Sequence, residues 1–222
     1  MTVRVTREAE PQIELYGAFS GQLAGNGKRE LTFTPTENYL IMVVKNTLSK
    51  VQLEEGAFKT SYIPTTTAAK TRSADIASIG VDQFGYNQKA GSVVVDYTEF
   101  HNYTASPYPR VLALTNGYSP REGLEILSFN SIGNVAGYVG GSSIFSFVGA
   151  TSTKTAFSAS ENNFSASFGG GAALTDTAGA MPSATLLELG KYSSLAFLNG
   201  HIKSIQYYPR RLSNAQLQEL TS

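Results

Sequence analysis

The sequence predicts an all-β sandwich that is closed by a short C-terminal helix. Charged residues make up 15% of the chain, below the roughly 25% of an average globular protein, whereas aromatic residues reach 11%. Long surface helices are usually rich in Glu and Lys, so this composition favours short strands joined by tight turns. Strand-like segments recur along the chain, and its C-terminal end carries a helical pattern.

The segments expected to form strands alternate apolar and polar residues or are rich in β-branched residues. They are Glu30–Thr34, Tyr39–Val44, Ser92–Thr98, Arg110–Thr115, Leu124–Phe129 and Ile144–Val148, with Asn116-Gly117 as the turn signal between the fourth and the fifth. The apolar run Tyr39–Val44 fits a buried strand and is far shorter than the roughly 20 residues that span a bilayer. In the last segment, the core candidates are Ile144, Phe145, Phe147 and Val148.

The clearest hairpin joins Lys154–Ala159 to Asn163–Phe168, with the turn residues in Ser160–Asn163. Its core side chains are expected to be Phe157, Phe164 and Phe168. Small residues dominate the rest of both arms, so we expect another part of the chain to pack closely over them.

The helix is expected at Asn214–Leu220. Ser213 is a good N-cap and Gln216 stands three residues later, which is the pattern of a capping box. Leu217 and Leu220 fall on one face, and two turns are too short to be stable in water, so the helix must dock on a sheet.

A strand and its exit are expected just before this helix. The buried residues would be Ile202, Ile205, Tyr207 and Leu212, with the turn Asn199-Gly200 before the strand. Pro209 ends the ladder because it has no N–H to donate.

The chain divides near Pro64–Thr67. Residues 65–75 are small and polar without strand alternation, which is typical of a linker. We therefore expect a β-rich N-terminal segment at 1–64, a linker at 65–75 and a sandwich at 76–222. Residues 1–64 are too few for a comfortable independent core.

The composition excludes several function classes. The 17 basic residues equal the 17 acidic ones, so the broad positive field of non-specific nucleic-acid binding is absent. Without Cys, and with His101 and His201 as the two histidines, the chain has neither a thiolate nor a multi-histidine metal site. The N-terminus has no apolar core of a secretory signal, so no export signal and no membrane insertion are expected.

Two segments resemble a known family. Val51–Thr65, continuing to Arg72 and Asp75, is similar to a junction of phage and prophage tail proteins, in which a carbohydrate-binding-module-like jelly-roll segment ends before a second sandwich. Leu198–Leu217 is similar to the end of that second sandwich, which has the concanavalin A-like or laminin-G-like fold. Between them, Thr155–Ala159 and Ala166–Gly170 resemble its penultimate hairpin.

The resemblance implies a virion protein of a phage tail fibre or tail tip, made in the bacterial cytoplasm. Its partners would be other virion proteins, further copies of itself in a homotrimer, and a host cell-surface polysaccharide. Only about 50 residues precede Val51, fewer than a complete jelly roll has. The N-terminal segment is therefore expected to anchor the protein and to mediate its self-association.

Catalysis is not expected. Hydrolases of the concanavalin A-like class carry carboxylates that face one cleft, and strand residues share a face at even offsets. Asp96 and Glu99 are at an odd offset, and Glu54 and Glu55 are adjacent, so both pairs diverge. We expect His201 to be a surface residue rather than a member of a catalytic triad.

No cofactor is expected. A calcium ion could be held at the rim of the sandwich, with Asp82 and Asp176 as candidates, but neither belongs to an acidic cluster and solvated loop acids are the favoured interpretation. Gly169–Gly171 precedes no Lys-Ser/Thr pair or helix and is interpreted as a loop rather than a phosphate cradle.

Whether the chain recognises a ligand, a glycan in particular, is the open question. Sugar rings stack on Tyr or Trp; Trp is absent, and the loop tyrosines are Tyr103, Tyr108 and Tyr118. Asn116 and Arg121 add polar contacts, which makes Asn116–Arg121 the preferred binding loop; the alternative is a plain surface hairpin. Adhesion should depend little on salt, because the net charge is zero. The competing functions are a purely architectural virion protein without a ligand and a bacterial surface lectin of a prophage remnant.

Overall fold

The chain consists of two units, Met1–Ser73 and Ala74–Ser222, in the computed structural model. The structure describes residues 3–7, 12–23, 30–45, 50–55, 61–71, 73–99, 108–118, 121–129, 132–149, 154–191 and 196–222. The division after Ser73 falls inside the predicted linker. Among the described residues, strands dominate both units and no helix is long and apolar enough to cross a bilayer.

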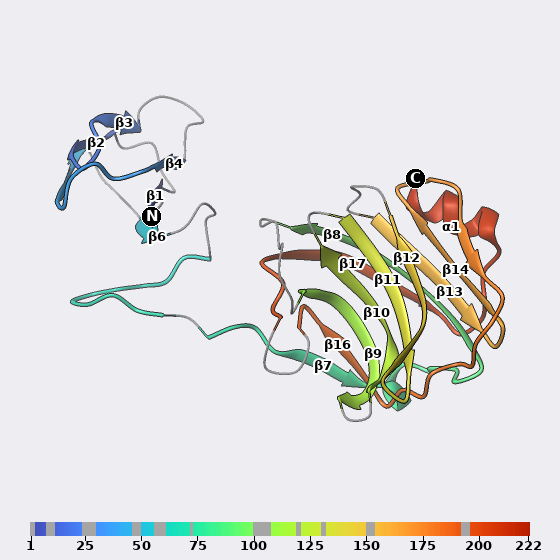
Figure 1. Ribbon diagram of the computed structural model, residues 1–222. Helices are drawn as coiled ribbons and strands as arrows, with labels where there is room; N and C mark the ends of the chain where they lie inside the picture. The colour runs from blue at the N-terminus through green and yellow to red at the C-terminus, as the bar shows by residue number, and fades with distance from the viewer. Residues whose placement is uncertain are drawn as a thin grey trace. The chain divides into compact units, whose positions relative to one another are not determined.

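The second unit is a sandwich of two antiparallel sheets (Figure 1). The six-stranded sheet has the order β12-β11-β10-β9-β16-β7, formed by Ser142–Val148, Ile132–Val139, Arg121–Phe129, Arg110–Tyr118, Leu186–Leu189 and Ala77–Gly80. The five-stranded sheet has the order β15-β14-β13-β8-β17, formed by Leu174–Asp176, Asn163–Phe168, Lys154–Ser160, Ala90–Glu99 and Gly200–Tyr208. The predicted all-β sandwich is confirmed.

The main core lies between these sheets and follows the alternation of strand side chains. Phe157, Phe164 and Phe168 are buried there, as predicted, against Phe145 and Phe147 of the other sheet. The rings of Phe145 and Phe164 are 4.7 Å apart between centroids. The expectation that Val148 belongs to this core is wrong: it is 57% exposed, because residues at odd offsets from Phe145 point to the opposite face of the sheet and Val148 is three residues away.

The five-stranded sheet is buried on its other face as well, beneath the C-terminal segment. Helix α1 (Asn214–Thr221) packs against β13, β14 and β8, and Figure 1 shows it lying along β13 and β14. Leu212 and Leu217 are buried there against Val94 and Ala156. The predicted helix, its docking and its capping box with Ser213 are confirmed.

Serine side chains make this close docking possible. The amide of Leu212 donates to Ser92 Oγ at 2.9 Å and to Ser158 Oγ at 3.2 Å, and the two hydroxyls are 2.7 Å apart. Farther along, Ser167 Oγ lies 3.0 Å from Thr221 Oγ1 of α1. Small polar side chains thus satisfy buried backbone groups while they let the segment approach the sheet.

The β9–β10 hairpin differs from its prediction. The two strands continue past Asn116-Gly117 to a backbone pair between Tyr118 and Arg121, and the register shifts between Arg121 and Gly123. Gly117 has a φ of 127°, and its amide donates to Thr115 Oγ1. Asn116-Gly117 is therefore an irregularity within the hairpin, not its turn.

The first unit has two three-stranded sheets. One has the order β4-β1-β6 (Glu30–Phe33, Val3–Arg7 and Val51–Glu55), and the other has β3-β2-β5 (Gly21–Leu23, Gln12–Gly17 and Leu40–Lys45). Its core is small, with Ile13, Leu15 and Phe33 buried. The expectation that Tyr39–Val44 is a buried strand is wrong: Tyr39 is 57% and Ile41 53% exposed, because the alternating residues of this strand face away from that core.

An aromatic cluster lies near the 3₁₀ turn η1 (Val81–Gln83), in the second unit. The Phe84 and Tyr207 rings are 5.2 Å apart, and Tyr86 lies 5.7 Å from Tyr207. The Tyr207 hydroxyl accepts from the amide of Asn87 at 2.8 Å. The Tyr86 hydroxyl is buried without a hydrogen-bond partner among the described residues, and burial raises its pKa to about 12.

These two tyrosines predict opposite effects of removing a hydroxyl. Tyr86→Phe removes a buried, unpaired polar group and should raise the free energy of unfolding by about 1 kcal/mol, whereas Tyr207→Phe leaves the amide of Asn87 unsatisfied and should lower it by about 1 kcal/mol. Urea unfolding of both variants measures this. Equal destabilisation by the two substitutions would contradict the assignment.

Candidate functional site

The structure separates the sequence-predicted binding residues. Asn116 is exposed near the C-terminal end of β9, where the backbones of Tyr118 and Arg121 pair across the hairpin. Tyr108 is half-buried just before the other end of β9. At about 3.3 Å per residue, Tyr108 and Asn116 are roughly 25 Å apart along the strand. Tyr103 and the side chains of Tyr118 and Arg121 lie outside the described residues.

A row of small and acidic side chains crosses the outer face of the six-stranded sheet. Ala113 of β9 pairs with Glu125 of β10 on one side and with Glu188 of β16 on the other. The neighbouring residues of each strand, such as Leu112, Leu124 and Leu187, point inward, so both carboxylates lie on the face opposite the core. Because two strand spacings separate them, their Cα atoms are roughly 10 Å apart.

The first carboxylate is held by an arginine. Arg110 Nε donates to Glu125 Oε2 at 2.8 Å, and the two side chains are 6% and 1% exposed. Arg110 also donates through Nη1 to the carbonyl of Tyr108, so the predicted binding residue is tied to this charge pair. A buried ion pair of this kind is favourable only when its hydrogen bonds are well placed. The pair therefore fixes the position of the segment before β9 that contains Tyr108.

The second carboxylate is only partly satisfied. Glu188 Oε1 lies 2.5 Å from Lys191 Nζ, with the Glu188 side chain 3% exposed and that of Lys191 13% exposed. Glu188 Oε2 is buried and has no hydrogen-bond partner among the described residues. A buried carboxylate oxygen without a partner is costly in a folded protein. Glu188 and Lys191 thus present an acceptor and a donor next to the fixed Arg110–Glu125 pair.

Sequence reasoning missed this cluster. Glu125 and Glu188 each stand between two apolar residues of a strand, a pattern that normally places the acid in solvent. The local sequence carries no signal that distinguishes these acids from solvent-exposed ones, since β10 also contains Arg121 and Glu122. Nothing in the spacing indicates that β9 and β16, which are far apart in the sequence, lie side by side.

The other predicted positions whose side chains are described make local contacts. Asp176 Oδ1 accepts from the amide of Ala178, and Asp96 pairs with Lys203 at 3.1 Å. No group of three potential metal ligands occurs in the part of the chain that the structure describes. His201 is exposed, His101 lies outside the described residues, and so does the side chain of Glu99. The amide of Gly170 donates to Thr221 Oγ1, so the glycine run contacts the C-terminal helix.

The fold is shared with carbohydrate-binding modules of sialidases. No family model matches the chain, and no curated protein matches it. The CBM40 module of the Ruminococcus gnavus IT-sialidase bound to α2,6-sialyllactose superposes with a TM-score of 0.53 and 13% identity, over 68% of this chain and 96% of that one. In complex with α2,3-sialyllactose, the same module has a TM-score of 0.51 and 14% identity, over 61% and 84% of the two chains.

The leech intramolecular trans-sialidase, complexed with 2,7-anhydro-Neu5Ac, is similar to this chain as well. Its TM-score is 0.51 at 14% identity, over 68% of this chain and 26% of the enzyme. Identities this low establish a common fold. The second unit is therefore a concanavalin A-like, laminin-G-like jelly-roll sandwich, as the sequence predicted.

A double-mutant cycle tests the buried charge pair. Glu125→Leu leaves the Arg110 guanidinium buried without its carboxylate and should lower the free energy of unfolding by about 3–5 kcal/mol. The double variant Arg110→Met/Glu125→Leu should recover most of that loss, because both charges are removed together. Chemical denaturation of the wild type, both single variants (Arg110→Met included) and the double variant gives the coupling. Additive losses would show that the two side chains do not depend on each other.

Proposed function

We propose that this chain is a non-catalytic attachment protein of a phage-type virion, in a tail fibre or tail tip, that binds a cell-surface glycan through its C-terminal sandwich. The fold supports the glycan part, since the similar modules of Ruminococcus gnavus have sialyllactose bound. The resemblance of Val51–Asp75 and Leu198–Leu217 to phage tail proteins supports the virion part.

The observation that carries glycan binding is the unsatisfied Glu188 carboxylate beside Lys191. Sugar hydroxyls donate and accept hydrogen bonds, and Lys191, the more exposed partner of the pair, can donate to a sugar oxygen. Glu188 Oε2 is buried, so a glycan hydroxyl supplies its missing donor only when the atoms that cover it move aside on binding. The Arg110–Glu125 pair keeps the adjacent segment in place, and Tyr108 belongs to that segment. Preorganised polar groups of this kind lower the cost of ordering the site on binding.

The hairpin residues Asn116, Tyr118 and Arg121 form the alternative binding end. Asn116 is exposed and lies three residues, or roughly 10 Å, along β9 from Ala113, the partner of Glu188. The two candidate sites therefore make separate predictions: substitutions at Glu188 test one site, and substitutions at Asn116 or Arg121 test the other. In either case we expect no cofactor and no hydrolysis of the glycan.

Self-association through the first unit is the second part of the proposal. Tyr39, Ile41 and Val43 lie on one exposed face of β5, and Tyr16 of β2 pairs with Ile41. We call these four residues the β5 face. At one side of it, Lys45 pairs with Glu14 at 2.6 Å. An apolar face with a polar rim is typical of a protein–protein interface, which supports a homotrimer or a contact with another virion protein.

The architectural alternative also rests on the β5 face. A protein that only joins or decorates virion parts needs this interface and no ligand site. Multivalent binding by an oligomer would instead sum several weak glycan sites. The two functions are separated by whether the sandwich binds a glycan.

Glycan binding is tested with the full-length oligomer. We expect saturable binding on a glycan array that includes α2,3- and α2,6-sialyllactose, with lactose as the uncharged comparison. Glu188→Gln keeps the shape but removes the charge, and should weaken binding at least tenfold. Asn116→Ala is the matched control at the hairpin and should leave binding unchanged.

The opposite result would place the site at the hairpin. In that case Asn116→Ala and Arg121→Ala lose glycan binding, whereas Glu188→Gln binds as the wild type does. Absence of binding to every glycan and to host cells, together with tight binding to a virion protein, would establish the architectural function instead. Circular dichroism and thermal melting verify that each variant is folded.

The oligomer is tested at the β5 face. Ile41→Glu places a charge in the apolar face and should weaken self-association at least tenfold, as measured by analytical ultracentrifugation. Val148→Glu, at an equally exposed apolar strand position of the sandwich, is the control and should leave the oligomer intact. A monomeric wild-type protein, or equal effects of both substitutions, would contradict this role of the β5 face.

A further inference from the structure

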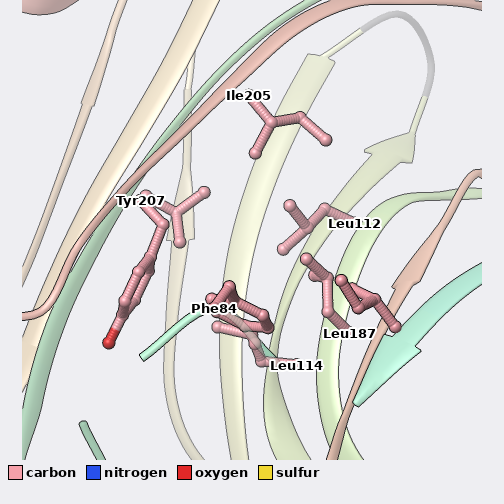
Figure 2. Close-up of a pocket in the computed structure, with 8 residues that line it drawn as sticks. Phe84, Leu112, Leu114, Leu187, Ile205 and Tyr207 are labelled. Atoms are coloured by element: carbon pink, nitrogen blue, oxygen red, sulfur yellow. The ribbon is translucent and has the colours of Figure 1, made fainter. Parts of the chain in front are cut away.

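An apolar pocket of about 230 Å³ lies between the two sheets of the sandwich. From the six-stranded sheet it is lined by Leu112 and Leu114 of β9 and by Leu187 of β16. From the five-stranded sheet, Ile205 and Tyr207 of β17 face them (Figure 2). The pocket is therefore framed by side chains of both layers and not by a single loop.

The pocket extends inward from one edge of the sandwich. Its lining begins at Ile79 on β7, the edge strand of the six-stranded sheet, and at β17, the edge strand of the other. It continues beneath β16 to β9, two strand spacings or roughly 10 Å from β7. Ile79 is 37% exposed, whereas Leu112 is fully buried. The pocket thus has an outer end at the surface and an inner end in the core.

The chemistry of the lining selects an apolar occupant. Apart from Tyr207, every lining side chain is hydrocarbon, and the Tyr207 hydroxyl is engaged by the amide of Asn87. Water needs two to four polar partners to occupy a cavity, and this lining does not supply them. The volume is about one and a half times the 150 Å³ of an engineered apolar cavity that stays dry and binds benzene.

We propose that this pocket is a binding site for an alkyl chain. The chain enters end-on between β7 and β17, lies against Phe84 and Tyr207, and ends near Leu112. Its polar head group stays at the mouth, beside Ile79. The depth across three strands fits a chain better than a compact ring, because the lining extends in one direction from the edge. This inference is independent of glycan binding.

The test uses the full chain with octanol as the probe, below its solubility limit. We expect saturable shifts of the Leu112, Leu114 and Leu187 methyl resonances, with one octanol bound per chain. Leu187→Phe fills the pocket from the β16 side and should weaken binding at least tenfold without a loss of thermal stability. Leu174→Phe makes the same change on the exposed edge strand β15 and should bind octanol as the wild type does.

A second arm separates the two sources of an alkyl chain. If the ligand is a membrane lipid, the protein cosediments with phosphatidylcholine vesicles and Leu187→Phe does not; if it is a free amphiphile, octanol binds but vesicles do not sediment the protein. Should Leu187→Phe fail to fold, Ile205→Phe blocks the pocket from the opposite sheet. The absence of saturable octanol binding, or undiminished binding in the folded blocking variant, would overturn the proposal.

Discussion

The close approach of the C-terminal segment to the five-stranded sheet is the constraint on which the second unit depends. β8 and β13 are buried on both faces, so their outward residues must be small enough to admit α1 and polar enough to satisfy its backbone. Ser92 and Ser158 meet both requirements, because each receives the amide of Leu212. With this face closed, the inward-facing aromatic residues can pack against the six-stranded sheet.

The outer face of the six-stranded sheet carries charged side chains, whereas that of the five-stranded sheet is covered by a helix. Arg110–Glu125 and Lys191–Glu188 place two ion pairs on adjacent strands around the small residue Ala113. Buried ion pairs are weak contributors to stability and strong determinants of geometry. A chain with no net charge that nevertheless buries Arg110, Glu125 and Glu188 on one face, with Lys191 partly buried beside them, has a polar site that packing alone does not require. That is the physical basis for the glycan binding proposed for this face.

In the proposed function, the sandwich serves recognition and the first unit serves assembly. The sandwich has a polar outer face and an apolar pocket, which are on opposite sides of the same β9 and β16 strands: Ala113 and Glu188 face outward, while Leu112, Leu114 and Leu187 face inward. The first unit has a small core and an exposed apolar face. A unit with so little buried area gains most from burying that face against another chain.

Local pattern was sufficient where neighbours in the sequence decide the structure. The hairpin of Lys154–Ser160 and Asn163–Phe168, its three core phenylalanines and the capping box at Ser213 all depend on residues a few positions apart. The same reasoning failed at Ile41 and Val148, because an apolar residue in a strand faces the core only if a second layer covers that side. Sequence by itself determined the all-β class, the C-terminal helix and the absence of thiol chemistry. Only the tertiary structure decided that Glu125 and Glu188 are buried as neighbours of Ala113, since pairing between distant strands is set by the whole sandwich and leaves no mark in the local alternation.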